Sequence, residues 1–147
     1  MARQKNALRK HEIAPFKQEE EVPKEGWVEL ARWIEEISDE SEDETDKYAD
    51  YAGDGTLRED VKGVTASWSY SGTFDADDEA QGIIKKMKRK KGLERKVWQR
   101  VTYTDGTVEQ GLATVTDIIA GSGTASDYEE FSCKITYDAM PEELPSA

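Results

Sequence analysis

The sequence predicts a small, mainly β domain, in which an antiparallel sandwich or rolled sheet is flanked by one α-helix. Three observations support this fold class. An alternating segment covers residues 63–74, apolar residues recur at helical spacing over 75–91, and an Asp-Gly dipeptide separates two further alternating segments. The chain of 147 residues is long enough to bury a core as one domain without disulfides or a structural metal.

The clearest predicted strand covers residues 63–74. Apolar and aromatic residues occupy one phase of this segment, and hydroxyl-bearing residues occupy the other. Because successive side chains of a strand point to opposite faces, we expect one buried face and one hydroxyl-lined face. The apolar phase consists of Val64, Ala66, Trp68, Tyr70 and Phe74, and the hydroxyl phase of Thr65, Ser67, Ser69, Ser71 and Thr73.

The predicted helix covers residues 75–91. Asp75 is a plausible N-cap, and the apolar residues that follow recur at i, i+3, i+4 and i+7. Acidic residues near the start and basic residues at the end complement the helix macrodipole. Gly92 is expected to end the helix. The apolar stripe consists of Ala80, Ile83, Ile84 and Met87.

The last third of the chain predicts a three-stranded meander over 95–104, 107–119 and 128–137. Asp105-Gly106 forms the first turn, which is the strongest hairpin signal in the chain, and a Gly-rich turn at 121–123 forms the second. The segment 27–37 fits both a helical stripe and a strand phase. Its β-branched and aromatic residues favour a strand.

The rest of the chain is predicted to flank this domain or to interrupt it. Residues 1–25 are basic, contain two prolines and lack a sustained period, which indicates a flexible N-terminal arm. The domain then covers 26–138, with a long acidic loop over 38–62, and residues 139–147 form a C-terminal tail.

The sequence does not favour an enzyme, and no cofactor or metal site is expected. The only histidine, His11, lies in the predicted arm, so a base beside a nucleophile is not available, and one Cys and one His cannot supply a zinc site. Cys133 is interpreted as a small buried hydrophobe. No stretch is apolar enough to predict a membrane span, and a net charge of -12 argues against a general affinity for nucleic acid.

Two oppositely charged runs are the candidate inter-subunit residues. The acidic loop is either a solvated face, a contact with another subunit or a negatively charged lining. The basic run is either a solvated helix end, a salt-bridging surface or a DNA contact. The acidic candidates are Asp39, Glu40, Glu42, Asp43, Glu44 and Asp46, and the basic candidates are Lys85, Lys86, Lys88, Arg89, Lys90 and Lys91.

The order of these elements resembles the major tail tube proteins of bacteriophages with long, non-contractile tails. The resemblance covers residues 26–138. It lies in GWVELARWIEEI, in the YAGDG of the acidic loop, in DVKGVTASWSYSGTFDADDEAQGIIKKM and in the C-terminal meander. It implies a structural virion protein, in which about six copies close into a ring whose sheets form a continuous barrel.

The same resemblance implies the partners and the location of the protein. The rings would stack into a tube around a tape-measure protein, contact tail-end proteins and let DNA pass through an acidic lumen. The protein would then belong to the virion tail, after assembly in the host cytoplasm.

Three alternatives stay open from the sequence. A tail terminator or head-tail connector ring is another small virion part of similar size. A β-rich carbohydrate-binding module would use Trp27, Trp33, Trp68 or Trp98 for stacking, although three of these four share strand phases with aliphatic residues, as core residues do. A DNA-binding accessory protein would use the basic run.

Overall fold

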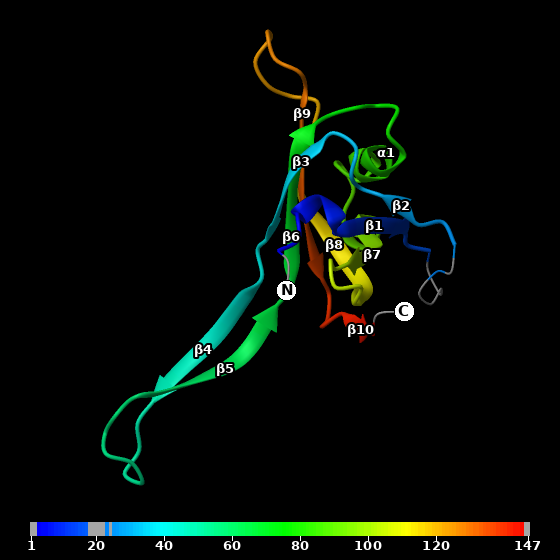
Figure 1. Ribbon diagram of the computed structural model, residues 1–147. Helices are drawn as coiled ribbons and strands as arrows, with labels where there is room; N and C mark the ends of the chain where they lie inside the picture. The colour runs from blue at the N-terminus through cyan, green and yellow to red at the C-terminus, as the bar shows by residue number, and fades with distance from the viewer. Residues whose placement is uncertain (1–2, 18–22, 24, 146–147) are drawn as a thin grey trace.

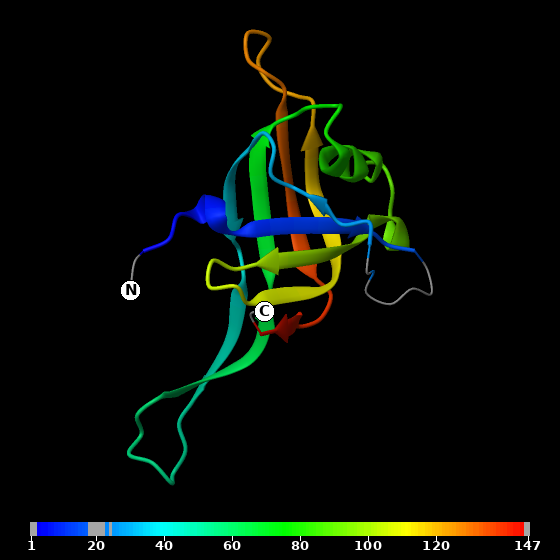
Figure 2. The same ribbon diagram turned by 45° about the vertical axis from the view of Figure 1, so that its right-hand side comes forward.

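The computed structural model describes residues 3–17, 23 and 25–145 as a curled antiparallel sheet with one short helix (Figures 1 and 2). The main sheet has the order β2-β1-β7-β8-β9-β6-β3, with β10 also paired to β8, and β4 and β5 form a separate two-stranded ribbon. The strands are β1 (Lys10–Pro15), β2 (Val28–Glu29), β3 (Ile34–Asp39), β4 (Glu42–Tyr48), β5 (Arg58–Thr65), β6 (Ser67–Thr73), β7 (Lys96–Thr102), β8 (Val108–Ala120), β9 (Glu130–Tyr137) and β10 (Glu142–Leu144); α1 is Glu79–Lys86, and η1 (Asn6–Leu8) and η2 (Gly92–Arg95) are 3-10 turns.

The sheet curls because β8 belongs to both of its halves. The first half of β8 pairs with β7, from Val108 opposite Thr102, and the second half pairs with β9, as far as Ala120 opposite Phe131. A bulge lies between Thr116 and Ile119, where two residues of β8 face one residue of β9. The strands on the two sides of this bend therefore run in clearly different directions, which forms a half-barrel (Figure 2).

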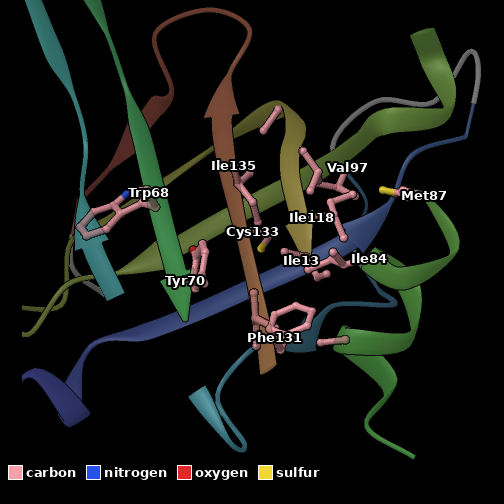
Figure 3. Close-up of a cluster of buried hydrophobic side chains, with 14 of the residues drawn as sticks. Ile13, Trp68, Tyr70, Ile84, Met87, Val97, Ile118, Phe131, Cys133 and Ile135 are labelled. Atoms are coloured by element: carbon pink, nitrogen blue, oxygen red, sulfur yellow. The ribbon is translucent and has the colours of Figure 1, made fainter. Parts of the chain in front are cut away.

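The core lies inside this curl, and α1 packs over it against β8 and β2 (Figure 3). The burial of β7 and β9 alternates along each strand, as the meander predicts. Trp68 and Tyr70 of β6 are also buried as expected. The central core residues, which include those labelled in Figure 3, are Ile13, Trp68, Tyr70, Ile84, Met87, Val97, Val101, Val115, Ile118, Phe131, Cys133 and Ile135.

The helix is shorter than the predicted range 75–91. Asp78, and not Asp75, is its N-cap, since the Asp78 carboxylate accepts a hydrogen bond from the backbone N–H of Gln81 at 3.1 Å. The helix ends at Lys86, and most of the basic run follows it as a turn. A run of adjacent lysines gives no periodic apolar anchor beyond Met87, so nothing holds a further helical turn against the core.

The prediction of a flexible arm over residues 1–25 is wrong for Lys10–Pro15. These residues form β1, which lies between β2 and β7, and Ile13 and Ala14 are buried. The error has a physical cause. This strand is short and contains charged residues and a proline at its end, and its partner β7 follows it by more than eighty residues in the sequence, so no local pattern marks it.

The prediction of a loop over residues 38–62 is also wrong. Residues Glu42–Tyr48 and Arg58–Thr65 pair as β4 and β5 in a hairpin that projects from the body of the molecule (Figure 1). Backbone pairing alone forms this ribbon, and its side chains are exposed, so it lacks the apolar alternation by which strands are recognised. Val64 belongs to this ribbon and is 49% exposed, in contrast to its predicted place in the core.

The remaining differences concern the C-terminal tail, the segment 27–37 and the tryptophans. Within the predicted tail 139–147, Glu142–Leu144 adds to the sheet as β10 beside Val108–Gln110. The segment 27–37 contains strands, as favoured, but a turn at Trp33 divides it into β2 and β3. Among the four tryptophans only Trp68 is buried. Trp98 is partly exposed because the buried phase of β7 carries Val97, Gln99 and Val101.

The start of β3 depends on a close approach of two backbones. Trp33 has a φ of 69°, in the left-handed region that large side chains rarely adopt, and its carbonyl accepts a hydrogen bond from Thr73 N–H at 2.9 Å. A Cβ on Gly72 of β6 would lie 1.9 Å from the Trp33 carbonyl oxygen. Only glycine therefore lets β3 begin at this point beside β6.

We expect Gly72→Ala to lower the free energy of unfolding by about 3 kcal/mol, because the clashing atom belongs to the backbone and cannot move aside. Gly82→Ala is the matched control. A Cβ on Gly82 meets no atom within 4 Å, and alanine is the better helix former, so this change should raise stability by about 0.5–1 kcal/mol. Urea unfolding measures both values, and equal effects of the two substitutions would contradict the packing described.

Candidate assembly surfaces

The β4–β5 hairpin carries most of the acidic candidates away from the body of the molecule. Glu42, Asp43, Glu44 and Asp46 lie on β4, whereas Asp39 ends β3 and Glu40 lies in the turn between these strands. The ribbon continues the directions of β3 and β6 beyond the sheet, so its whole surface meets solvent (Figures 1 and 2).

The charges of this hairpin are not balanced within the chain. Asp46 lies directly opposite Asp60 in the register of the two strands, an arrangement that is unfavourable because like charges face each other. Within the described residues, the hairpin contains one ion pair, in which Lys62 Nζ lies 3.7 Å from Glu44 Oε1. Acidic side chains outnumber basic ones over residues 42–65.

The hairpin also exposes apolar side chains, although it has no core of its own. Tyr48, Tyr51, Leu57 and Val61 are all exposed, with Val61 57% accessible. A two-stranded ribbon without a hydrophobic face is marginally stable in isolation. A ribbon with these exposed side chains is typical of a segment that packs against another molecule.

The polar face of the curled sheet is a second surface. On β6, Ser69 and Ser71 point away from the core, and Ser132 and Lys134 of β9 lie directly beside them in the register. Ser67 belongs to the predicted hydroxyl phase but is buried, because the turn that carries Glu40 covers it through a hydrogen bond from Glu40 N–H to the Ser67 carbonyl. The face is otherwise polar and partly accessible, as the alternation predicts.

The basic candidates lie at the other end of the molecule from the hairpin. Lys85 and Lys86 end α1, and residues 88–91 form the turn that follows. Lys85 Nζ lies 4.8 Å above the ring of Phe74. The structure therefore brings neither the acidic residues nor the apolar hairpin side chains near the basic run within one copy (Figure 1).

Trp33 forms an exposed corner of the sheet just before β3. Its indole Nε1–H donates to Asp75 Oδ2 at 2.8 Å, and the Arg32 guanidinium lies 5.3 Å from its ring centre. The backbone N–H of Asp77 and the indole N–H of Trp33 lower the pKa of the Asp75 carboxyl. The corner lies at the head of β3, which is a free edge of the sheet. The left-handed backbone of Trp33 and its contacts with Asp75 and Arg32 are visible in the tertiary structure and not in the sequence pattern.

The buried side of α1 holds this corner in place. The Gln81 side chain is fully buried, and its Nε2 donates to the carbonyls of Thr73 at 3.0 Å and Arg32 at 3.3 Å. Its Oε1 accepts from the backbone N–H of Asp75 at 2.7 Å. Because a buried amide with these partners is costly to displace, Gln81 fixes the backbone at Arg32, before Trp33, against the backbone of Thr73 and Asp75.

His11 lies in a buried polar cluster, in contrast to its predicted place in a flexible arm. It is 2% exposed, and its Nε2 accepts a hydrogen bond from Arg9 Nε–H at 2.7 Å, so the ring proton lies on Nδ1, 2.9 Å from Tyr70 Oη. Gln99 Nε2 donates to the same Tyr70 oxygen at 2.6 Å. Burial, together with the positive charge of Arg9, lowers the pKa of His11 to about 3.

Neither His11 nor Cys133 is placed as a catalytic group. Both hydrogen-bonding positions of the His11 ring are occupied, and burial raises the pKa of the Cys133 thiol to about 12, so the reactive thiolate is disfavoured. Over the described ranges, no three His, Cys, Asp or Glu side chains are grouped as metal ligands would be. No helix in these ranges has the length and apolar character needed to cross a membrane.

Comparison with solved structures identifies the fold. A chain from the tail of an empty gene transfer agent particle, determined with C6 symmetry, has a TM-score of 0.71 at 14% identity, with 97% of this chain and 100% of that chain covered. A chain from the virion of the native gene transfer agent particle has a TM-score of 0.66 at 16% identity, with the same coverage of both chains. The chain therefore has the fold of tail tube proteins.

The similarity extends to contractile injection systems. A chain of the PVC sheath-tube complex of an extracellular contractile injection system, in the extended state, has a TM-score of 0.54 at 13% identity, with 97% of this chain and 91% of that chain covered. The tube-terminating cap of the anti-feeding prophage has the same TM-score at 14% identity, with 100% of this chain and 95% of that chain covered. These neighbours are structural tube and particle proteins and not enzymes.

No protein-family model matches the sequence, and no curated protein sequence matches it either.

We expect the stability of the protein to decrease as the pH falls through the range in which unfolded His11 gains a proton. The folded pKa lies near 3 and the unfolded value near 6.5, so the unfolded state binds more protons between these limits and gains stability relative to the folded state. His11→Asn keeps a donor toward Tyr70 but does not titrate, so its free energy of unfolding should change less with pH.

The measurement is urea unfolding at several values between about pH 6.5 and 5.5, which is above the range of ordinary carboxylates. The parent protein should lose stability over this interval, and the variant should stay nearly constant. Equal slopes for the two proteins would contradict the buried, neutral state of His11.

Proposed function

We propose that this chain is a structural virion protein that assembles into hexameric rings, which stack into a tail tube. The observation that carries the proposal is the similarity of nearly the whole chain to a tail subunit in a C6-symmetric particle. The free sheet edges and the unsupported hairpin add to it, because a chain with such surfaces gains most when copies of itself cover them.

The two edges of the main sheet are the surfaces proposed to close a ring. The order of the sheet leaves β2 at one edge and β3 at the other, and each presents backbone groups on one side without a strand beside it in the described chain. Lateral contact between copies would continue the sheet around the ring and remove these edges. Trp33, at the head of β3, would lie at such a contact.

The polar face of β6 and β9 is proposed to face the lumen. Its serine and threonine side chains interact well with water, and a net charge of -12 repels phosphate groups from most of the surface. A lumen that held DNA through many cationic contacts would retain it. A hydroxyl-lined and acidic tube instead lets the polymer slide during passage.

The remaining parts of the proposal follow from the same role. A tube of a long, non-contractile tail would enclose a tape-measure protein and contact tail-end proteins at its two ends. The protein would then be part of the virion tail and would assemble in the host cytoplasm. The acidic hairpin and the basic run are proposed as inter-subunit contacts, since each has a large uncompensated charge.

A second candidate is a ring that ends the tube. The anti-feeding prophage protein that resembles this chain is a tube-terminating cap, and its similarity covers the whole of this chain. A terminator ring would share the lateral contacts of a tube subunit but would not stack repeatedly. The length of the assemblies therefore separates the two candidates.

The test is negative-stain microscopy of the purified chain over a range of concentrations. A tube subunit should form tubes or stacked rings with six-fold end views, and longer tubes at higher concentration. Single rings that never stack would favour the terminator. Dispersed monomers at every concentration would contradict both candidates.

A further inference from the structure

We propose that the basic concavity beside η2 receives the acidic β4–β5 hairpin of a second copy of this chain. The inference rests on the proposed function, because it identifies one pair of surfaces by which the copies assemble. The hairpin of another copy suits this concavity because the two surfaces have complementary charges and lie at opposite ends of the molecule.

The concavity has a volume of about 660 Å³ and lies between the turn after α1 and the strand β8. Lys90 and Lys91 line one side of it, and the exposed side chain of Leu93 contributes an apolar part. Asp117 is the single carboxylate among its lining residues. A site with cationic walls and an apolar part suits a segment that combines carboxylates with apolar side chains.

Arg95 shapes this concavity through its hydrogen bonds to the backbone. Its guanidinium donates to the carbonyl oxygens of Lys88 at 2.8 Å, Lys90 at 2.9 Å and Val115 at 3.3 Å. Three bonds from one rigid group fix the backbone of the basic turn against β8. The lysine side chains of the turn are therefore presented from a preformed backbone, which reduces the entropy lost when a partner binds.

The positive charge of the turn is not neutralised within the copy. Among residues 3–17, 23 and 25–145, no carboxylate forms an ion pair with Lys88, Arg89, Lys90 or Lys91. In contrast, Lys96 at the edge of the concavity is paired with Asp138 at 2.6 Å. Of these four residues, Lys90 and Lys91 line the concavity.

The hairpin has the matching properties. The opposed pair Asp46 and Asp60 places two like charges at one position of the ribbon, and Tyr48 lies on the same face two residues beyond Asp46. Neither aspartate forms an ion pair among the described residues, so a cation from outside would relieve the repulsion between them. The lysines of the concavity supply that cation, and Leu93 supplies an apolar contact for the ribbon.

The contact must join different copies. The hairpin projects from one end of the molecule, and α1 and the turn that follows it lie toward the other end, on the far side of the sheet (Figures 1 and 2). The seven residues of β4 alone span about 23 Å, so the ribbon reaches well beyond its own body. Because the two surfaces differ, the contact is heterologous, and a heterologous contact repeats into rings or open filaments instead of closing as a dimer.

The test uses two charge-swap variants of the full chain and their combination. Lys90→Glu with Lys91→Glu reverses the concavity, and Asp46→Lys with Asp60→Lys reverses the hairpin. Each double variant should fold as the parent chain does, because all four residues are exposed, but should lose assembly at concentrations where the parent assembles. The combined variant has the net charge of the parent chain and should regain assembly, as should an equal mixture of the two double variants.

Sedimentation velocity measures self-association, electron microscopy scores tubes, and circular dichroism verifies the fold. If either double variant assembles like the parent, or if both fail and neither the combination nor the mixture recovers, the proposed contact is wrong. A parent chain that self-associates without forming tubes would contradict the tail tube role, while the charge-swap series would still measure this contact.

Discussion

The bend of β8 is the constraint on which the architecture depends. This one strand pairs with β7 along its first half and with β9 along its second, and the bulge at Asp117 and Ile118 lies within the second pairing. Asp117 takes a φ of 54° there, while Ile118 turns into the core opposite Cys133. Without the bulge, the side chains of the second half would be out of phase with the core, since a shift of one residue reverses the faces of a strand.

The curl that follows from this bend separates the molecule into an apolar inside and a polar outside. The phase of β6 that buries Trp68 and Tyr70 necessarily presents Ser69 and Ser71 on the outer face. The core and the polar face are thus two results of the same alternation. Selection for an apolar core therefore also constrains the outer face. This coupling suits the proposed tube subunit, which needs both a folded core and a water-accessible face toward the lumen.

Much of the charge of this chain is left without compensation inside one copy. The hairpin aligns Asp46 with Asp60, and the turn after α1 concentrates lysines that Arg95 holds in place. The strands of the hairpin and the lysine side chains of the turn do not belong to the core. We propose that these segregated charges act in contacts with further copies of the chain.

The sequence by itself determined the strands and helix whose pattern is local: β6, the meander of β7, β8 and β9, and the amphipathic α1 were all predictable because one face of each packs on the core. Only the tertiary structure decided that Lys10–Pro15 is a strand, since its stabilising partner β7 is distant in sequence. It also decided that the acidic loop is a ribbon, whose backbone pairing has no apolar signature, and that Trp33 is an exposed corner, because its strained φ depends on Gly72 of another strand. The acidic and basic candidates were recognisable as charged runs, but their positions at opposite ends of one molecule follow from the fold alone.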